Sequence, residues 1–193
     1  MKTLILIHGY ARSGKTTLLN QLQKQGHSIV STSQELDFIT CKRFILPRYC
    51  IEYLRNKDNE KLNKVYGVPV NCRNLKIDTA ENWYIPKFGR ASLIEKAFLN
   101  QLDPHNCSDL VFFETIGGEE AELAKEYWQE HFNQSTLSLN IRRSTEVKGC
   151  DIRELAPKNN FQNIFNCPEI AVNQLLSYVQ QLINLETLEP TWS

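Results

Sequence analysis

One stretch near the start of the chain restricts its fold more than any other: residues 3–22, which read TLILIHGYARSGKTTLLNQL. An apolar run leads into Gly9, and four residues later Gly14 is followed by Lys15 and Thr16. The run is short, continuous and bounded by glycine, so it predicts a strand that is buried on both faces. Leucines at helical spacing follow the lysine and predict a helix. The chain must therefore accommodate a buried strand, a tight loop and a helix in immediate succession.

The loop between this strand and this helix fits the pattern G-x-x-x-x-G-K-[ST] at every position. Its glycines let successive backbone amides point into one concavity, and the N-terminus of the helix adds partial positive charge. In this context the pattern predicts a P-loop that binds a nucleoside triphosphate. Lys15 would reach the β- and γ-phosphates, and the Thr16 hydroxyl would bind Mg²⁺. The expected binding residues are Gly9, Tyr10, Ala11, Arg12, Ser13, Gly14, Lys15, Thr16 and Thr17.

A second candidate for the metal lies in the apolar run DLVFFET, residues 109–115. Glu114 ends this run, and the carboxyl ends of parallel strands are where α/β sheets bind ligands. We predict that Glu114 contacts Mg²⁺ or the acceptor, with a solvent-exposed or arginine-paired glutamate as the alternative. Glu35 and Asp37 are further candidates as a general base, and a favourable interaction with a helix dipole explains them equally well.

The alternation of strand and helix patterns along the chain predicts an α/β fold with a mainly parallel sheet and helices on both faces. Further strands are expected at 28–31 and 136–141, and helices at 14–25, 91–102 and 119–132. Residues 56–89 are polar, punctuated by glycine and proline, and poorly periodic, so they predict a long excursion from the core. With 193 residues the chain has the length of one domain.

Composition limits the classes of partner. The 22 basic residues balance 22 acidic ones, so no net charge attracts nucleic acid or an anionic membrane. The short apolar stretch near the N-terminus is far below the length of a signal sequence or a membrane span. The six cysteines show no zinc-ligand spacing and are expected to be reduced thiols. We expect a cytoplasmic protein with small-molecule partners, no membrane or nucleic-acid partner, and we leave a homo-oligomer open.

Features beyond the loop favour a small kinase over other enzymes with this loop. No D-x-x-G follows Glu114 and no N-K-x-D is present, which argues against a GTPase. A late polar segment at 142–158 carries Arg142, Arg143 and Arg153. Guanidinium groups on such a segment can close over a transferring phosphoryl group. Surface arginines balanced by neighbouring carboxylates are the alternative.

With these residues the chain resembles the P-loop nucleoside and nucleotide kinases, and among them the bacteriophage-type deoxynucleoside monophosphate kinases. The resemblance covers most of 1–25 and 105–185, and it is carried by the P-loop, FFETIGGEEAEL, SLNIRRS, KGCDIREL and NIFNCPEIAVNQLLSYV. It implies one P-loop NTPase three-layer domain over 1–193. Within this domain it implies an acceptor-binding insert at about 40–100 and a lid at about 142–158.

The resemblance implies phosphoryl transfer from ATP, with Mg²⁺, to a nucleoside monophosphate, and a deoxynucleotide is the expected acceptor. Another small metabolite or a polynucleotide end is the alternative acceptor. The implied catalytic residues are Lys15, Glu114, Arg142 and Arg153, and the implied metal ligands are Thr16 and Glu114.

The alternatives that remain open concern Ile116 and Trp83. Ile116 stands where the family has an arginine, so a nucleotide-binding switch with little or no kinase activity is the alternative function. Glu120 stands at the family's helix-opening glutamate. In the insert a base could stack on Trp83, although packing also explains a tryptophan there.

Overall fold

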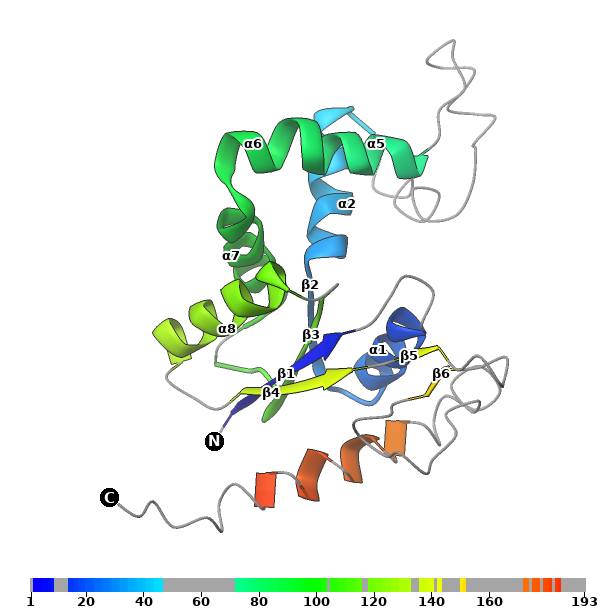
Figure 1. Cartoon of the computed structure of the whole chain (residues 1–193), viewed down its shortest axis with the longest axis vertical. Coiled ribbons are helices and arrows are strands. Elements are labelled where there is room, and N and C mark those ends of the chain that lie inside the picture. Colours follow the sequence, from blue (N-terminus) through cyan, green and yellow to red (C-terminus); the bar gives the residue numbers. More distant parts are fainter. Residues whose placement is uncertain are drawn as a thin grey trace. The chain divides into compact units, whose positions relative to one another are not determined.

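The computed structural model describes 2–8, 14–46, 72–103, 105–115, 118–132, 136–140, 142–143 and 150–151, together with 172–173, 175–177, 179–181 and 183–184. Its contacts divide the chain into two compact units (Figure 1). We call Met1–Val30 with Asp103–Ser193 the sheet unit, and Ser31–Leu102 the helical unit. The insert predicted at about 40–100 falls within the helical unit. The single domain over 1–193 stays a prediction.

The sheet unit is built on four parallel strands, β1 (Thr3–His8), β2 (Ser28–Ser31), β3 (Leu110–Glu114) and β4 (Thr136–Asn140). Their order across the sheet is β2-β3-β1-β4. The central strand β1 pairs with β3 and β4, and this register sets Ile7 beside Glu114 and His8 beside Asn140. The predicted α/β class with a mainly parallel sheet is confirmed for the described residues.

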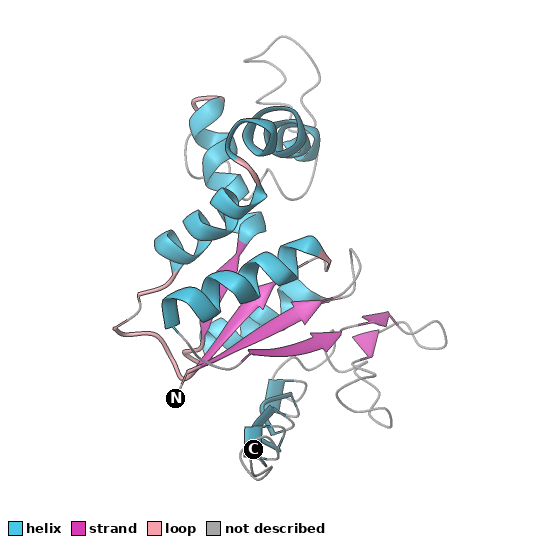
Figure 2. Ribbon diagram, turned by 60° about the vertical axis from the view of Figure 1, so that its left-hand side comes forward, coloured by secondary structure: helices cyan, strands magenta, loops and turns pink. Residues whose placement is uncertain are grey.

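Helices cover both faces of this sheet. The helix α1 (Lys15–Lys24) follows β1, and α8 (Glu119–Phe132) follows β3. One face of β1 packs Ile5 and Ile7 in a core cluster with leucines of α1 and with helical positions between 172 and 179. Because strand side chains alternate, Leu4 and Leu6 lie on the opposite face. Both are fully buried, and α8 contacts β1 (Figure 2).

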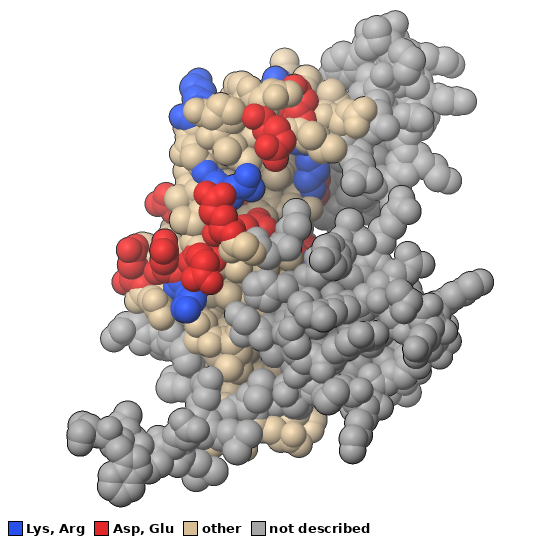
Figure 3. All heavy atoms as spheres, in the orientation of Figure 1, with Lys and Arg blue, Asp and Glu red and all other residues tan. Residues whose placement is uncertain are grey.

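The outer surface of α8 is acidic. Four glutamates at helical spacing are exposed there, namely Glu119, Glu122, Glu126 and Glu130. Figure 3 shows acidic side chains gathered over this helix. Its inner surface buries Ala121, Ala124 and Trp128. This division into an apolar and a charged side is the amphipathic pattern that the sequence predicted for the helix, with the same bounds.

The helical unit contains α2 (Thr32–Arg43), α5 (Cys72–Asp78), the π-helix η1 (Thr79–Tyr84), α6 (Ile85–Phe88) and α7 (Arg90–Gln101). The buried hydroxyl of Ser31 caps α2, because it accepts a hydrogen bond from the backbone N–H of Gln34 at 3.4 Å. The helices α2 and α7 pack together, and Ile39, Tyr84 and Leu93 form a small core. The predicted helix at 91–102 is confirmed as α7.

The excursion predicted at 56–89 is helical over its described part. The elements α5, η1 and α6 follow one another without a break from 72 to 88. A π turn bonds residue i to i+5 and so contains about one more residue than an α turn, which moves apolar positions out of the 3.6-residue period. Pro86, a residue type that usually interrupts helices, is the second residue of α6, which begins directly after the π-helix. The interrupted period explains why the sequence pattern did not indicate this helix.

Two short strands lie in the predicted lid segment. The strand β5 (Arg142–Arg143) pairs antiparallel with β6 (Cys150–Asp151). The segment's other positions, Arg153 among them, lie outside the described residues. Among the helices that the structure describes, none has both the length and the apolar character that crossing a membrane requires.

Candidate functional site

The carboxyl ends of β1 and β3 lie side by side in the sheet unit. Ile7 is in register with Glu114, and the backbone N–H of Thr115 donates to the Ile7 carbonyl at 3.1 Å, so the pairing continues past β3. From β1 the chain runs through α1 to β2, and from β3 it runs through α8 to β4. These two connections leave in opposite directions across the sheet. The point of divergence, between β1 and β3, is where open parallel sheets bind ligands.

The N-terminus of α1 lies at this edge of the sheet. Gly14 is its N-cap and has φ 92°, a left-handed conformation that glycine adopts at no steric cost. Because Gly14 has no side chain, it cannot cap the first backbone amides of the helix, and such amides bind anions. Lys15 opens the helix and is buried, with 8% of its surface exposed. Gly9 to Ser13, the rest of the predicted P-loop, lie outside the described residues.

Thr16 and Glu114, the two predicted metal ligands, are brought into contact although 98 residues separate them. The Thr16 hydroxyl donates a hydrogen bond to Glu114 Oε1 at 3.1 Å. Both groups present oxygen atoms, which are the ligands that Mg²⁺ takes, and Mg²⁺ usually completes its shell with water and substrate phosphate. The donor atoms at this edge of the sheet therefore fit a magnesium ion.

A second contact at the end of β3 was not expected from the sequence. The buried hydroxyl of Thr115 donates to Glu120 Oε2 at 3.2 Å, which ties the strand end to the first turn of α8. A carboxylate in a first turn also interacts favourably with the helix dipole. Glu120, identified by resemblance as the helix-opening glutamate, thus has a structural partner. In the sequence, this contact could have been suspected only from the position of Thr115, whose hydroxyl comes directly after the strand.

The remaining predicted site residues are described only in part. Thr17 is half-buried in the first turn of α1. The backbone of Arg142 lies in β5, opposite Asp151. Ile116 and Arg153 lie outside the described residues.

Asp37 and Glu35 are both buried on α2, but their contacts differ. Asp37 Oδ1 forms an ion pair with Lys76 Nζ at 2.8 Å. The same ammonium group donates to the carbonyl and hydroxyl oxygens of Ser33, at 2.6 and 2.7 Å. Lys76 therefore joins α5 to the first turn of α2, and this favours a structural role for Asp37 over a general base.

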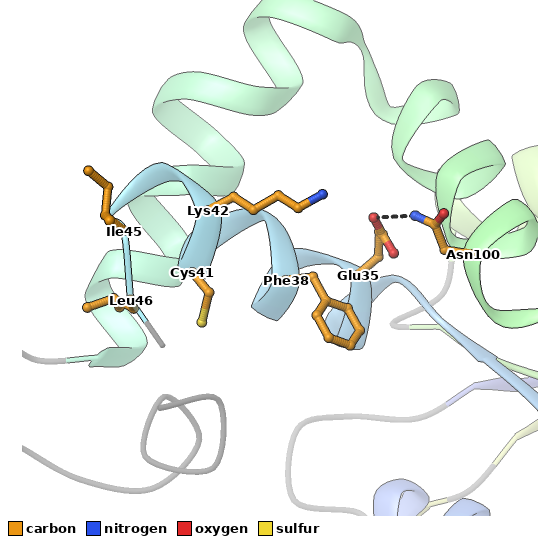
Figure 4. Close-up of a pocket in the computed structure, with 7 residues that line it drawn as sticks. All are labelled: Glu35, Phe38, Cys41, Lys42, Ile45, Leu46 and Asn100. Carbon is orange, nitrogen blue, oxygen red and sulfur yellow. Dashed lines mark hydrogen bonds between the residues drawn. The ribbon is translucent and has the colours of Figure 1, made fainter. Parts of the chain in front are cut away.

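Glu35 lines a pocket of the helical unit with a volume of about 670 Å³ (Figure 4). Its Oε1 accepts a hydrogen bond from Asn100 Nδ2 at 2.9 Å. Its Oε2 is buried and has no hydrogen-bond partner among the residues that the structure describes. The whole residue is only 3% exposed. The other lining residues are Phe38, Cys41, Lys42, Ile45, Leu46 and Asn100.

Backbone strain marks the far end of this pocket. The N–H of Leu46 donates to the Cys41 carbonyl at 2.8 Å and that of Ile45 to the Lys42 carbonyl at 3.4 Å, the two bonds of a Schellman motif. The motif places a left-handed residue after the helix, and Ile45 occupies this place with φ 55° and 91% of its surface exposed. A β-branched residue in this conformation is an outlier, and such strain clusters at functional sites.

Trp83 packs among charged and aromatic side chains of the helical unit. The guanidinium carbon of Arg43 lies 5.3 Å from its ring centroid, and Lys87 Nζ lies at 6.0 Å. Phe88 meets its ring edge-on, with centroids 5.9 Å apart. Arg43 is held in turn by Asp78 at 2.8 Å. These contacts favour packing over base stacking for Trp83.

No family model matches this chain, and no curated protein matches it. We therefore infer the function from two sites within the described residues. One is the sheet edge where Thr16 contacts Glu114, and the other is the pocket lined by Glu35.

Proposed function

We propose that this protein transfers a phosphoryl group from ATP to a nucleoside monophosphate, with a deoxynucleotide as the expected acceptor. The observation that carries this proposal is the hydrogen bond between Thr16 and Glu114 at the divergence of β1 and β3. A strand, loop and helix with the G-x-x-x-x-G-K-[ST] pattern supports phosphate binding only. A carboxylate beside the threonine of this pattern adds a metal-binding oxygen of the kind that phosphoryl transfer uses.

Each residue at this edge has a role that follows from its chemistry. The ammonium group of Lys15 and the first amides of α1 stabilise negative charge on the phosphates. Thr16 and Glu114 would hold Mg²⁺, which when bound supplies positive charge at the phosphate oxygens. Arg142 and Arg153 of the predicted lid segment would add further positive charge. The rate enhancement comes mainly from positioning and electrostatic stabilisation.

The finer statements about the fold belong to the same proposal. The strand order and the helices on both faces support a P-loop NTPase three-layer fold. The helical unit is inserted in the chain between β2 and β3, and its position supports an acceptor-binding insert. A small nucleotide as the partner, rather than nucleic acid, agrees with the balanced charge of the chain. We place the protein in the cytoplasm.

The proposal is tested by incubating the protein with radiolabelled ATP, Mg²⁺ and each nucleoside monophosphate in turn. We expect one acceptor to become a labelled diphosphate. Lys15→Ala should lower the rate by about 10²-fold or more, because it removes a preorganised charge at the phosphates. Lys24→Ala is the matched control, since Lys24 is an exposed residue of the last turn of the same helix. ATP binding without transfer to any acceptor would contradict the proposal and favour a nucleotide-binding switch.

A further inference from the structure

The pocket of the helical unit contains a buried carboxylate oxygen that lacks a partner. Glu35 Oε2 makes no hydrogen bond within the described part of the chain, although the residue is only 3% exposed. Leaving such a group unpaired costs its full desolvation free energy, so native proteins contain few of them. Each one calls for an explanation. A ligand that donates a hydrogen bond to this oxygen would remove the cost.

The orientation of Glu35 is held from a second helix. Asn100 lies on α7 and donates to the other carboxylate oxygen, so one oxygen is anchored while the second, which is buried, has no partner within the described residues. Figure 4 shows Glu35 and Asn100 facing each other, with the ring of Phe38 beside Glu35. A group fixed by packing and a supporting hydrogen bond is suited to recognise a ligand.

The rest of the pocket indicates what kind of ligand fits. Glu35, Phe38 and Lys42 lie at positions i, i+3 and i+7 of α2, which places them along one face of the helix. Together they offer a hydrogen-bond acceptor, a flat apolar surface and, at an exposed position, a positive charge. A planar heterocycle with an N–H donor and an anionic substituent complements all three groups.

We propose that this pocket binds the base of the acceptor nucleotide and that Glu35 Oε2 accepts a hydrogen bond from an exocyclic amino group of that base. Adenine, cytosine and guanine carry such a group, whereas thymine presents a carbonyl oxygen in its place. A carbonyl facing Oε2 sets two acceptors against each other and leaves both unpaired. Glu35 is thus a specificity-determining residue. The inference deepens the proposed function and rests on it, because it takes the ligand to be a nucleoside monophosphate.

The first test compares ligands that differ by an amino group, on the full-length protein and by isothermal titration calorimetry. The pairs are dAMP with dIMP, dGMP with dIMP, and dCMP with dUMP. In at least one pair we expect the amino-bearing nucleotide to bind about 10-fold more tightly or better, since sites built to bond an N–H reject analogues that lack it. Equal affinity in every pair, tighter binding of the members that lack the amino group, or no binding at all would overturn the inference.

A substitution then assigns the preference to Glu35. Glu35→Gln keeps the size of the side chain and an acceptor for Asn100, but it replaces Oε2 by an amide that donates. We expect the preference within the responsive pair to disappear or, in the pairs that exchange the amino group for a carbonyl, to invert towards the carbonyl-bearing nucleotide. Glu95→Gln, at an exposed position of α7, is the matched control and should keep the wild-type preference. If Glu35→Gln retains that preference, the role proposed for Glu35 is wrong. If the variant does not fold, the comparison of the wild-type pairs decides by itself.

The two proposals fail in different ways. Selective binding of an amino-bearing nucleotide without phosphoryl transfer would contradict the proposed function and leave the pocket assignment standing. Phosphoryl transfer at equal rates to acceptors with and without the amino group would support the proposed function and contradict the assignment of the pocket.

Discussion

At the scale of single residues, the contacts of a carboxylate separate structural from functional candidates. Glu35 and Asp37 lie two positions apart on α2 and are both buried. Asp37 is paired with Lys76, whereas Glu35 lines a pocket and has one buried oxygen without a hydrogen-bond partner among the described residues. Glu114 forms a third case, because it meets the hydroxyl of Thr16 at the sheet edge. Residue type and spacing predicted all three as candidates, and only their partners distinguish them.

The hydroxyl of Thr16 should matter for transfer and not for folding. Thr16→Ala removes the oxygen that contacts Glu114, and we expect phosphoryl transfer to fall by about 10²-fold. Thr16→Ser keeps the oxygen and should retain most of the activity. Because Thr16 is exposed, the free energy of unfolding of the protein in urea should change by no more than about 0.5 kcal/mol in either variant. Equal activity of Thr16→Ala and Thr16→Ser would argue against a metal ligand at this position.

His27 should contribute to the pH dependence of stability. Its ring lies edge-on to Phe112 with centroids 5.5 Å apart, and burial lowers the pKa of His27 below its ordinary value of 6.5. The unfolded chain then binds a proton at a pH where the folded protein does not. The free energy of unfolding should therefore fall as the pH drops through 6.5 towards the lower folded pKa.

Urea unfolding at pH 7.5 and pH 5.5 measures this effect. The loss of stability between these two values should be smaller in His27→Gln than in the wild type. An unchanged loss would mean that the pKa of His27 is not lowered in the folded protein.

At the scale of elements, burial decides which helix positions carry stability. Leu22 of α1 is fully buried in the core cluster beneath the sheet, so Leu22→Ala leaves a cavity there. We expect a loss of about 2–5 kcal/mol in the free energy of unfolding. Gln23→Ala, at the exposed next position, should change it by less than about 0.5 kcal/mol. Similar effects of both substitutions on the urea midpoint would contradict the packing of α1.

Elements that follow one regular period could be predicted from the sequence. The run at Leu110–Glu114 and the amphipathic stretch at Glu119–Phe132 were predicted as strand and helix because burial imposes their pattern directly. The helical stretch from 72 to 88 could not be predicted in this way. Its π turn changes the period in mid-element, and no single template matches both halves.

At the scale of the whole molecule, the sequence by itself determined the strand before the predicted loop, the helix after Gly14, the α/β class and the candidate residues. These follow from local patterns of burial, glycine and charge, which act over a few residues. Only the tertiary structure decided the strand order, the contact between Thr16 and Glu114, and the buried oxygen of Glu35 that has no partner among the described residues. Each of these depends on groups from distant parts of the chain. Which partner a side chain meets is decided when the elements pack, and no local pattern records it.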